Sequence, residues 1–439
     1  MTVAVLLCAS LAARGAALVP ARTQAAVVFD GDAGVAGMRE FLEAAGTKSR
    51  ALSAREVSGD LAALVGADLL SGAPGWGLDR RGIRALVVAG AAYGLSAPVR
   101  DGKAARKALL AWVSAAGPWS KRHGTRTPVA AGSGRSQRAG IVAPQGGSLR
   151  LFTASGRGAE ALVTAFRQIG AKRSPSRALS SDKRLGPLLA EVAGTAAVIV
   201  RGDDPITYSV LDLLANRSGI VARGVVGARS PLLDGHAPDA SGCAGAVLFC
   251  LRASLGPSGQ AAFALAVQTY FSWTSAAGPL PEFVRREAPL ARALLVKSDG
   301  LDVGLLGEPE TSLWALHLVA AVAGTHPREV PADLKGEGPR SRCLHAEGNS
   351  VQYSIPCADA RADLRDGDGP ALQATADPAA LDASLSRLSA LDAFRGSVPA
   401  AFLGARLLAG GFLRGSGPFT LTGDPDPLGA RIELRLPLR

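Results

Sequence analysis

Two residues have the spacing of a serine nucleophile and its base. Ser180 and Lys183 fit the S-x-x-K pattern, which places serine and lysine one helical turn apart in penicillin-recognising enzymes. Residues 297–300 (KSDG) are a broken form of the K-T-G motif of those enzymes, and no S-D-N triplet lies between the two. Four-residue matches arise by chance, so the competing interpretation of Ser180-Ser181-Asp182-Lys183 is a solvated helix start.

A glycine-rich turn has the form of a nucleotide site. Gly156–Ala161 fits G-x-G-x-x-A between an expected strand and an expected helix, where glycines let the backbone approach a pyrophosphate. The next element of such a site is a buried strand that ends in an acid, but Lys172–Arg177 (KRSPSR) is basic. We therefore expect a tight turn here and no cofactor. The five histidines show neither H-E-x-x-H nor i,i+4 spacing, so we expect no metal.

The densest basic stretch of the chain lies beside Trp119. Its members are the candidate anion-binding residues Lys121, Arg122, Arg126, Arg135 and Arg138. Cations beside an aromatic ring could bind single-stranded nucleic acid or an anionic polymer of the cell envelope. The competing interpretation is a mobile, soluble loop over Gly117–Arg138.

Four cysteines remain if residues 1–26 are removed, and they predict disulfide bonds. They are Cys243, Cys250, Cys343 and Cys357. A hairpin centred on Ser350 would place Cys343 opposite Cys357, within disulfide reach, and Cys243 would then pair with Cys250. The alternatives are a four-thiolate zinc site, whose usual close spacing is missing, and isolated buried thiols.

The N-terminus has the form of an export signal. Val3–Ala13 is an apolar run of signal-peptide length, too short to span a membrane, and cleavage near Ala26 would start the mature chain at Val27. The chain has 439 residues, with 48 Lys and Arg against 37 Asp and Glu, a net charge of +11. This charge favours anionic partners. No run of 18 uncharged apolar residues occurs, so we expect no transmembrane span.

The elements that would position these residues follow a recurring order of strand, polar turn and amphipathic helix. Asp101 is expected to cap the helix Lys103–Ala116, which carries an apolar stripe opposite Lys103, Arg106 and Lys107. Further helices are expected at Ile206–Leu214 and at Leu313–Ala323, which contains His317. Other elements are expected at Arg84–Ala89, Ser148–Thr153, Thr195–Val200, Ala246–Leu251 and Leu372–Thr375 (strands), and at Ala379–Phe394 (a helix after Asp377).

The fold class predicted from this order is α+β, with repeated strand-turn-helix units on largely antiparallel sheets. Two strand-like runs around Gly423–Pro427 predict a C-terminal β-hairpin. The expected organisation is a signal peptide over residues 1–26, α+β units over 27–140 and 141–240, and a disulfide-containing domain over 241–439.

Two short segments resemble parts of known proteins. Ala97–Gly102 before an Ala/Leu-rich helix, and Gly77-Leu78-Asp79 before a strand, are similar to segments of uncharacterised exported bacterial proteins built of repeated α+β units. The resemblance covers about the first third of the chain and a few later segments. It implies export and an α+β fold, and assigns no site residues.

Taken together, the sequence predicts a periplasmic or secreted protein with a non-catalytic binding or scaffolding role in the cell envelope. Its expected partner is an anionic envelope component or another envelope protein. The alternative is a serine-type envelope hydrolase that uses Ser180 and Lys183.

Overall fold

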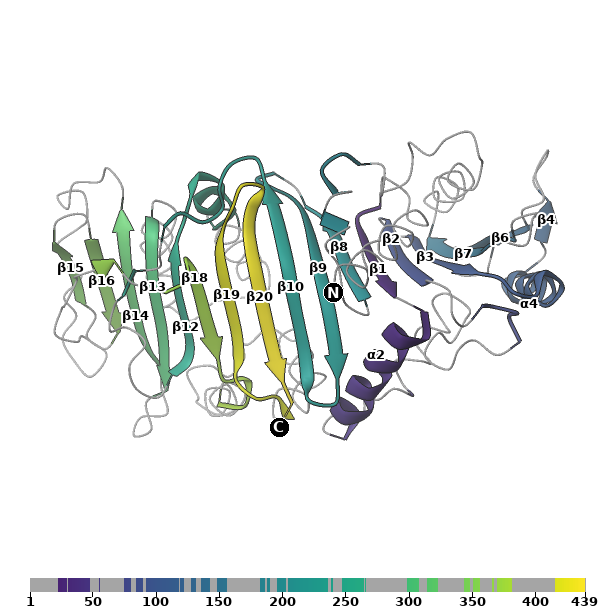
Figure 1. Cartoon of the computed structure of the whole chain (residues 1–439), viewed down its shortest axis with the longest axis horizontal. Helices are drawn as coiled ribbons and strands as arrows, with labels where there is room; N and C mark the ends of the chain where they lie inside the picture. Colours follow the sequence, from purple (N-terminus) through teal and green to yellow (C-terminus); the bar gives the residue numbers. More distant parts are fainter. Residues whose placement is uncertain are drawn as a thin grey trace, which may run out of the picture. The chain divides into compact units, whose positions relative to one another are not determined.

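A computed structural model of the chain gives the positions of its helices and strands (Figure 1). The residues it describes are 23–29, 31–47, 55, 75–79, 84–89, 92–117, 119–121, 128–131, 136–142, 148–155, 182–185, 188–189, 196–202, 204–235, 238–239, 247–263, 265, 298–307, 314–322, 343–347, 350–355, 365–366, 369–380 and 415–438.

The chain divides into two compact units. The N-terminal unit comprises residues 1–202 and 208–224, and the C-terminal unit comprises 203–207 and 225–439. The boundary predicted near 140 falls inside a strand, Ser136–Val142, that pairs along its length with Ser148–Ser155. Residues 27–140 and 141–240 are therefore not separate compact units, because hydrogen bonds of one sheet join them.

The N-terminal unit is built on an antiparallel sheet. Its elements are β1 (Ala25–Phe29), α2 (Gly31–Gly46), β2 (Arg84–Ala89), β3 (Ala92–Pro98), α4 (Gly102–Ser114), β4 (Trp119–Lys121), β5 (Pro128–Ala131), β6 (Ser136–Val142), β7 (Ser148–Ser155), β8 (Ala196–Arg201), β9 (Ile206–Asn216) and the first part of β10 (Gly219–Ala228). The strands pair in the order β9-β8-β1-β2-β3-β7-β6-β5-β4, every neighbour antiparallel.

One core cluster of this unit lies between α4 and one face of the sheet. Leu95 pairs with Leu151 and Ala97 with Leu149, and all four side chains are fully buried. Because alternate residues of a strand share a face, these form one apolar surface. The apolar stripe of α4 packs on it through Leu109, Trp112 and Val113. The prediction that this segment forms a helix packed on a sheet is thus confirmed.

The C-terminal unit is also built of antiparallel strands. Its strands are β12 (Val247–Ser254), β13 (Ser298–Gly307), β14 (Trp314–Val322), β15 (Cys343–Glu347), β16 (Ser350–Ile355), β18 (Leu372–Ala376), β19 (Phe419–Asp426) and β20 (Gly429–Pro437). They pair in the order β20-β19-β18-β12-β13-β14-β16-β15. A separate short pair joins β11 (Pro238–Asp239) to β17 (Arg365–Asp366). The sequence-predicted C-terminal hairpin is β19–β20, although its strand runs on to Asp426 and the turn lies at Pro427-Leu428.

The strands of the two units share one connection order. Seven strands of each unit correspond in chain order, and the corresponding strands also have corresponding neighbours. The pairing order is β9-β8-β1-β2-β3-β7-β6 in the N-terminal unit and β19-β18-β12-β13-β14-β16-β15 in the C-terminal unit. A helix follows the first strand in both, α2 after β1 and helical residues 257–263 after β12. The architecture is therefore mixed α and β, with largely antiparallel sheets, as the sequence predicted.

Three expected elements were wrong. Ile206–Leu214 and Leu313–Ala323 were predicted as helices, but they form the strands β9 and β14. Burial in β9 alternates, with Tyr208, Val210 and Asp212 inward, because apolar runs of this length fit either period and the neighbouring strands decide. Gly117–Arg138, predicted as a loop, contains β4, β5 and the start of β6.

Candidate functional site

The start of α4 is fixed by a short segment, Gly75–Asp79. The carbonyl of Gly77 accepts hydrogen bonds from Arg100 N (2.9 Å) and Asp101 N (3.0 Å), and Asp79 N donates to the carbonyl of Pro98 (3.0 Å). Gly77 has φ +62°, a conformation that favours glycine. The segment therefore holds the turn from which α4 begins.

Asp101 caps α4, as predicted. Its Oδ1 accepts hydrogen bonds from Lys103 N (2.9 Å) and Ala104 N (3.1 Å), two of the first-turn amides that lack helical partners. These bonds favour the charged carboxylate and therefore hold the pKa of Asp101 below its ordinary value. The bond from Ala104 has the largest effect, followed by the bond from Lys103, and the positive charge of Lys103 lowers the pKa further.

The cap makes the stability of α4 depend on pH. Because the pKa of Asp101 is lowered on folding, its contribution is fully present above pH about 4 and is lost as the pH falls through the lower folded-state value. We expect Asp101→Ala to lower the melting temperature at pH 7 and to have little effect near pH 2. Asp101→Asn should keep the cap, because asparagine also caps helices, but lose this pH dependence. Thermal melts of the three chains across pH 2–7 check this, and equal slopes for all three would contradict it.

The far end of α4 is held by Arg138. Its Nη1 donates to the carbonyl of Trp112 (3.0 Å), one of the last helix carbonyls that have no partner within the helix. The guanidinium lies over the indole of Trp112, with Cζ 5.3 Å from the ring centroid. Trp76 packs edge-on against the same indole, with ring centroids 6.4 Å apart. Arg138 therefore joins β6 to α4.

This contact bears on the predicted anion-binding stretch. Arg138 is the one member whose side chain is described, and it is engaged with Trp112. Lys121 ends β4, and nothing is described of its side chain; Arg122, Arg126 and Arg135 lie outside the described residues. Of this stretch, the described residues therefore place one side chain, that of Arg138, and they place it against α4.

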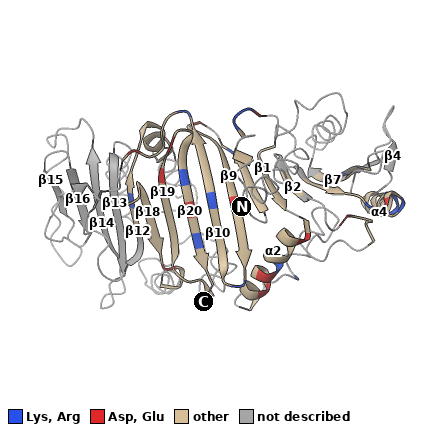
Figure 2. Cartoon of the chain, viewed as in Figure 1, with Lys and Arg blue, Asp and Glu red and all other residues tan. Residues whose placement is uncertain are grey.

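A different group of cations lies along the outer side of α4. Lys103, Arg106 and Lys107 are exposed and lie at i, i+3 and i+4, which places them on one face of the helix. Arg100, just before the cap, is exposed as well. Leu110 continues the stripe and is 38% exposed. Figure 2 shows Lys and Arg on α4. From the sequence, Lys103, Arg106 and Lys107 were expected opposite the apolar stripe, and no role was assigned to them.

These four cations differ in their surroundings from five exposed arginines on the strands and their connections, each of which lies within ion-pair distance of a carboxylate. The pairs are Arg201–Asp182 (3.4 Å), Arg223–Asp212 (3.8 Å), Arg229–Asp204 (3.1 Å), Arg431–Asp426 (3.5 Å) and Arg435–Glu433. Arg100, Lys103, Arg106 and Lys107 have no ion-pair partner among the described residues. The outer side of α4 is therefore a positive surface without ion pairs among the described residues, at whose start the charge of Asp101 acts on Lys103.

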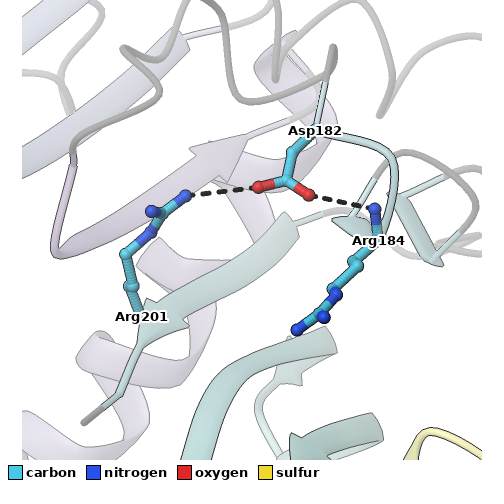
Figure 3. A network of polar contacts seen from close by, with 3 residues as sticks. All are labelled: Asp182, Arg184 and Arg201. Atoms are coloured by element: carbon cyan, nitrogen blue, oxygen red, sulfur yellow. Dashed lines mark hydrogen bonds and ion pairs between the residues drawn. The ribbon is translucent and has the colours of Figure 1, made fainter.

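The predicted serine–lysine pair is not brought together by the described residues. Lys183 is exposed in a turn that precedes the helical residue Leu185, and Ser180 lies outside them. The neighbouring Asp182 accepts hydrogen bonds from Arg184 N (2.9 Å) and from Arg201 Nη2 (3.4 Å) (Figure 3). These contacts tie the turn to the end of β8, which is a structural role.

One further cation, Arg150, is buried in the N-terminal unit. It lies on the sheet face opposite α4, paired with Ser96 across β3 and β7, and both residues are buried. Burial lowers the pKa of Arg150, because removal from water disfavours the charged form. The sheet is thus covered on both faces at this point.

Cys250, on β12, is buried and disulfide-bonded. Strand register excludes Cys343 as its partner. Cys250 pairs with Gly304, Gly304 with His317, His317 with Ser354, and Ser354 with Cys343. Four strand spacings separate the two cysteines by about 19 Å, whereas the Cα atoms of bonded cysteines lie about 4.4–6.8 Å apart.

The predicted register of the other two cysteines was wrong. Cys343 lies opposite Ser354, not Cys357, because Ser350 already belongs to β16 and only residues 348–349 connect the strands. The hairpin centre therefore lies before Ser350, and Cys357 falls beyond the end of β16. Cys243 and Cys357 lie outside the described residues.

We expect the partner of Cys250 to be Cys243. Register excludes Cys343, and Cys243 lies close to Cys250 along the chain. Proteolysis without reduction, followed by mass spectrometry, should give a peptide that joins Cys243 to Cys250. A peptide that joins Cys250 to Cys357 would contradict the prediction, and the Cys243→Ser variant should lose the joined peptide.

Several sequence-predicted features lie outside what can be placed. The glycine-rich turn Gly156–Ala161 lies outside the described residues, as do His123, His236, His326 and residues 1–22. His317 lies on β14 and His345 on β15, and nothing is described of their side chains. No helix in the described ranges has the length and hydropathy needed to cross a bilayer. No family model, curated protein or solved structure matches the chain.

Proposed function

We propose that the chain is an exported, non-catalytic binding or scaffolding protein of the cell envelope. The disulfide bond of buried Cys250 carries the proposal, because disulfides persist in oxidising compartments and are rare in the cytosol. The cations of α4 support a binding role, since positive side chains that form no ion pair among the described residues are available to an anionic partner molecule.

The proposed export signal needs one adjustment. Cleavage after Ala26 would cut β1, in which Ala25 and Ala26 pair with strands on both sides. Ala26 and Thr23 are also buried, at 2% and 3% exposed. We therefore place the cleavage site before Thr23, within residues 1–22.

We also propose that the two units are repeats of one larger α+β unit. The support is their common strand order, which matches in pairing and along the chain for seven strands from β1 to β9 and from β12 to β19. Each proposed repeat thus contains seven paired strands and the helix after the first of them. It is larger than the strand-turn-helix segment that the sequence indicated.

Export can be tested with the full chain carrying a C-terminal epitope in a bacterial host. We expect the protein in the periplasmic or secreted fraction, with an N-terminus shortened to a point before Thr23. Alkylation of thiols before and after reduction should show oxidised cysteines, and the paired variant C243S/C250S should lose two of them. Free thiols and an intact Met1 would overturn the proposal, and labelling of Ser180 by a fluorophosphonate would overturn its non-catalytic part.

A further inference from the structure

We propose that the outer side of α4 docks on an anionic phospholipid surface. The proposal rests on the proposed function, which places the chain beside a membrane of the envelope. The docking surface consists of Arg100, Lys103, Arg106, Lys107 and Leu110, all exposed.

The geometry of this surface suits a flat, negatively charged partner. Lys103 and Lys107 are one helical turn apart, about 6 Å along the helix axis, and Arg106 lies between them on the same face. The opposite side of α4 is fixed in the core by Leu109, Trp112 and Val113. The cations therefore project together from a helix whose rotation is fixed by packing.

The positions of the cations are unfavourable for the fold itself. Lys103, Arg106 and Lys107 lie in the first two turns of α4, where the positive end of the helix dipole repels them, and the first turn holds no acid. Like charges at i+3 and i+4 also destabilise a helix. Asp101 is the carboxylate that offsets them at the cap. A partner that supplies negative charge would remove this cost.

Phospholipid fits better than nucleic acid. Trp112 is 9% exposed and Trp76 is packed against it, so neither ring is open for a base to stack on. The next residue of the stripe is instead apolar, Leu110, which can enter the boundary between headgroups and acyl chains. Because the apolar stripe of α4 is used in the core, the contact is mainly electrostatic, at the level of the lipid phosphates.

The test compares three purified full-length chains in vesicle co-sedimentation. They are the unchanged chain, the variant K103Q/R106Q/K107Q, and the control R39Q/K183Q/R217Q, which removes the same charge from exposed positions in the same unit. Glutamine keeps the helix propensity high. The vesicles are phosphatidylcholine alone and phosphatidylcholine with phosphatidylglycerol, at low and physiological salt. Heparin and a single-stranded oligonucleotide serve as anionic competitors.

We expect the unchanged chain and the control to bind only the phosphatidylglycerol vesicles, more weakly at higher salt. The K103Q/R106Q/K107Q variant should partition about 100-fold less, since each cation near an anionic leaflet contributes about a factor of five. Its melting temperature should be unchanged or higher, because repulsion within α4 is removed.

Three results would overturn the proposal. They are equal losses in both variants, binding to neutral vesicles, or binding to heparin or the oligonucleotide without binding to lipid. The assay does not depend on export. If cysteines prove free in cells while the α4 variant alone loses vesicle binding, the proposed function fails and the docking surface remains.

Discussion

Replacing Trp112 by alanine is expected to lower the free energy of unfolding of the N-terminal unit by about 3–5 kcal/mol. The indole is 9% exposed and packs among Leu95, Leu149 and Leu151 of the sheet. It also contacts the ring of Trp76 edge-on and lies beneath the guanidinium of Arg138. The substitution therefore opens a cavity and removes the link between α4 and β6.

Leu110→Ala is the matched control for this prediction. Leu110 lies on the same helix, two residues away, but is exposed, so its truncation should change stability by no more than about 0.5 kcal/mol. Urea unfolding followed by circular dichroism compares the two variants, and hydrogen exchange should localise the loss to α4 and β6. Equal effects of the two substitutions would show that Trp112 does not anchor α4.

The second large effect is expected at Gly77. A Cβ there would collide with the carbonyl oxygen of Asp101 and lie 3.0 Å from Cβ of Ala104, and φ is +62°. Since backbone atoms cannot move aside as a flexible side chain can, Gly77→Ala should cost about 3 kcal/mol. The segment Gly75–Asp79 would detach and the start of α4 would lose the bonds to the Gly77 carbonyl.

Gly75→Ala separates the steric effect from the conformational one. Gly75 also has a positive φ, +84°, but no atom lies within 4 Å of its added Cβ. Its substitution should cost only the strain of a left-handed residue, about 1 kcal/mol. Thermal melts and hydrogen exchange of the first turn of α4 test the pair, and a cost at Gly75 as large as that at Gly77 would rule out the collision as the cause.

Local signals in the sequence were sufficient for several elements. Arg84–Ala89 was predicted with the bounds of β2, and α4 was predicted within two residues at each end together with its cap, Asp101. In both cases the pattern is settled within the segment: β-branched residues favour the strand, and an acid followed by 3–4 periodicity specifies the helix.

Elements whose type depends on pairing with other strands were not predictable in this way. Ile206–Asn216 and Trp314–Val322 are apolar runs that fit either a helix or a strand, and their hydrogen bonds to β8, β13 and β16 make them strands. The register of Cys343 similarly depended on where one turn begins. Local pattern carries no information on such pairings.

The cations of α4 were visible in the sequence as the face opposite the apolar stripe, and no role was assigned to them. What distinguishes this face is the absence of acids at i±3 and i±4 from Lys103, Arg106 and Lys107, in the half of the helix where cations are disfavoured. Whether a cation has an acidic partner from another element, as Arg229 has Asp204, emerges only from the fold.

The shared strand order also locates the largest difference in spacing between corresponding strands of the two units. In the N-terminal unit, residues 202–205 alone lead from β8 to β9, whereas residues 377–418 separate the corresponding strands β18 and β19. Added chain between neighbouring strands leaves their hydrogen bonds intact and costs little in loop entropy. If one ancestral sheet was doubled, this junction is where its second copy could acquire new sequence without altering the framework inherited by both.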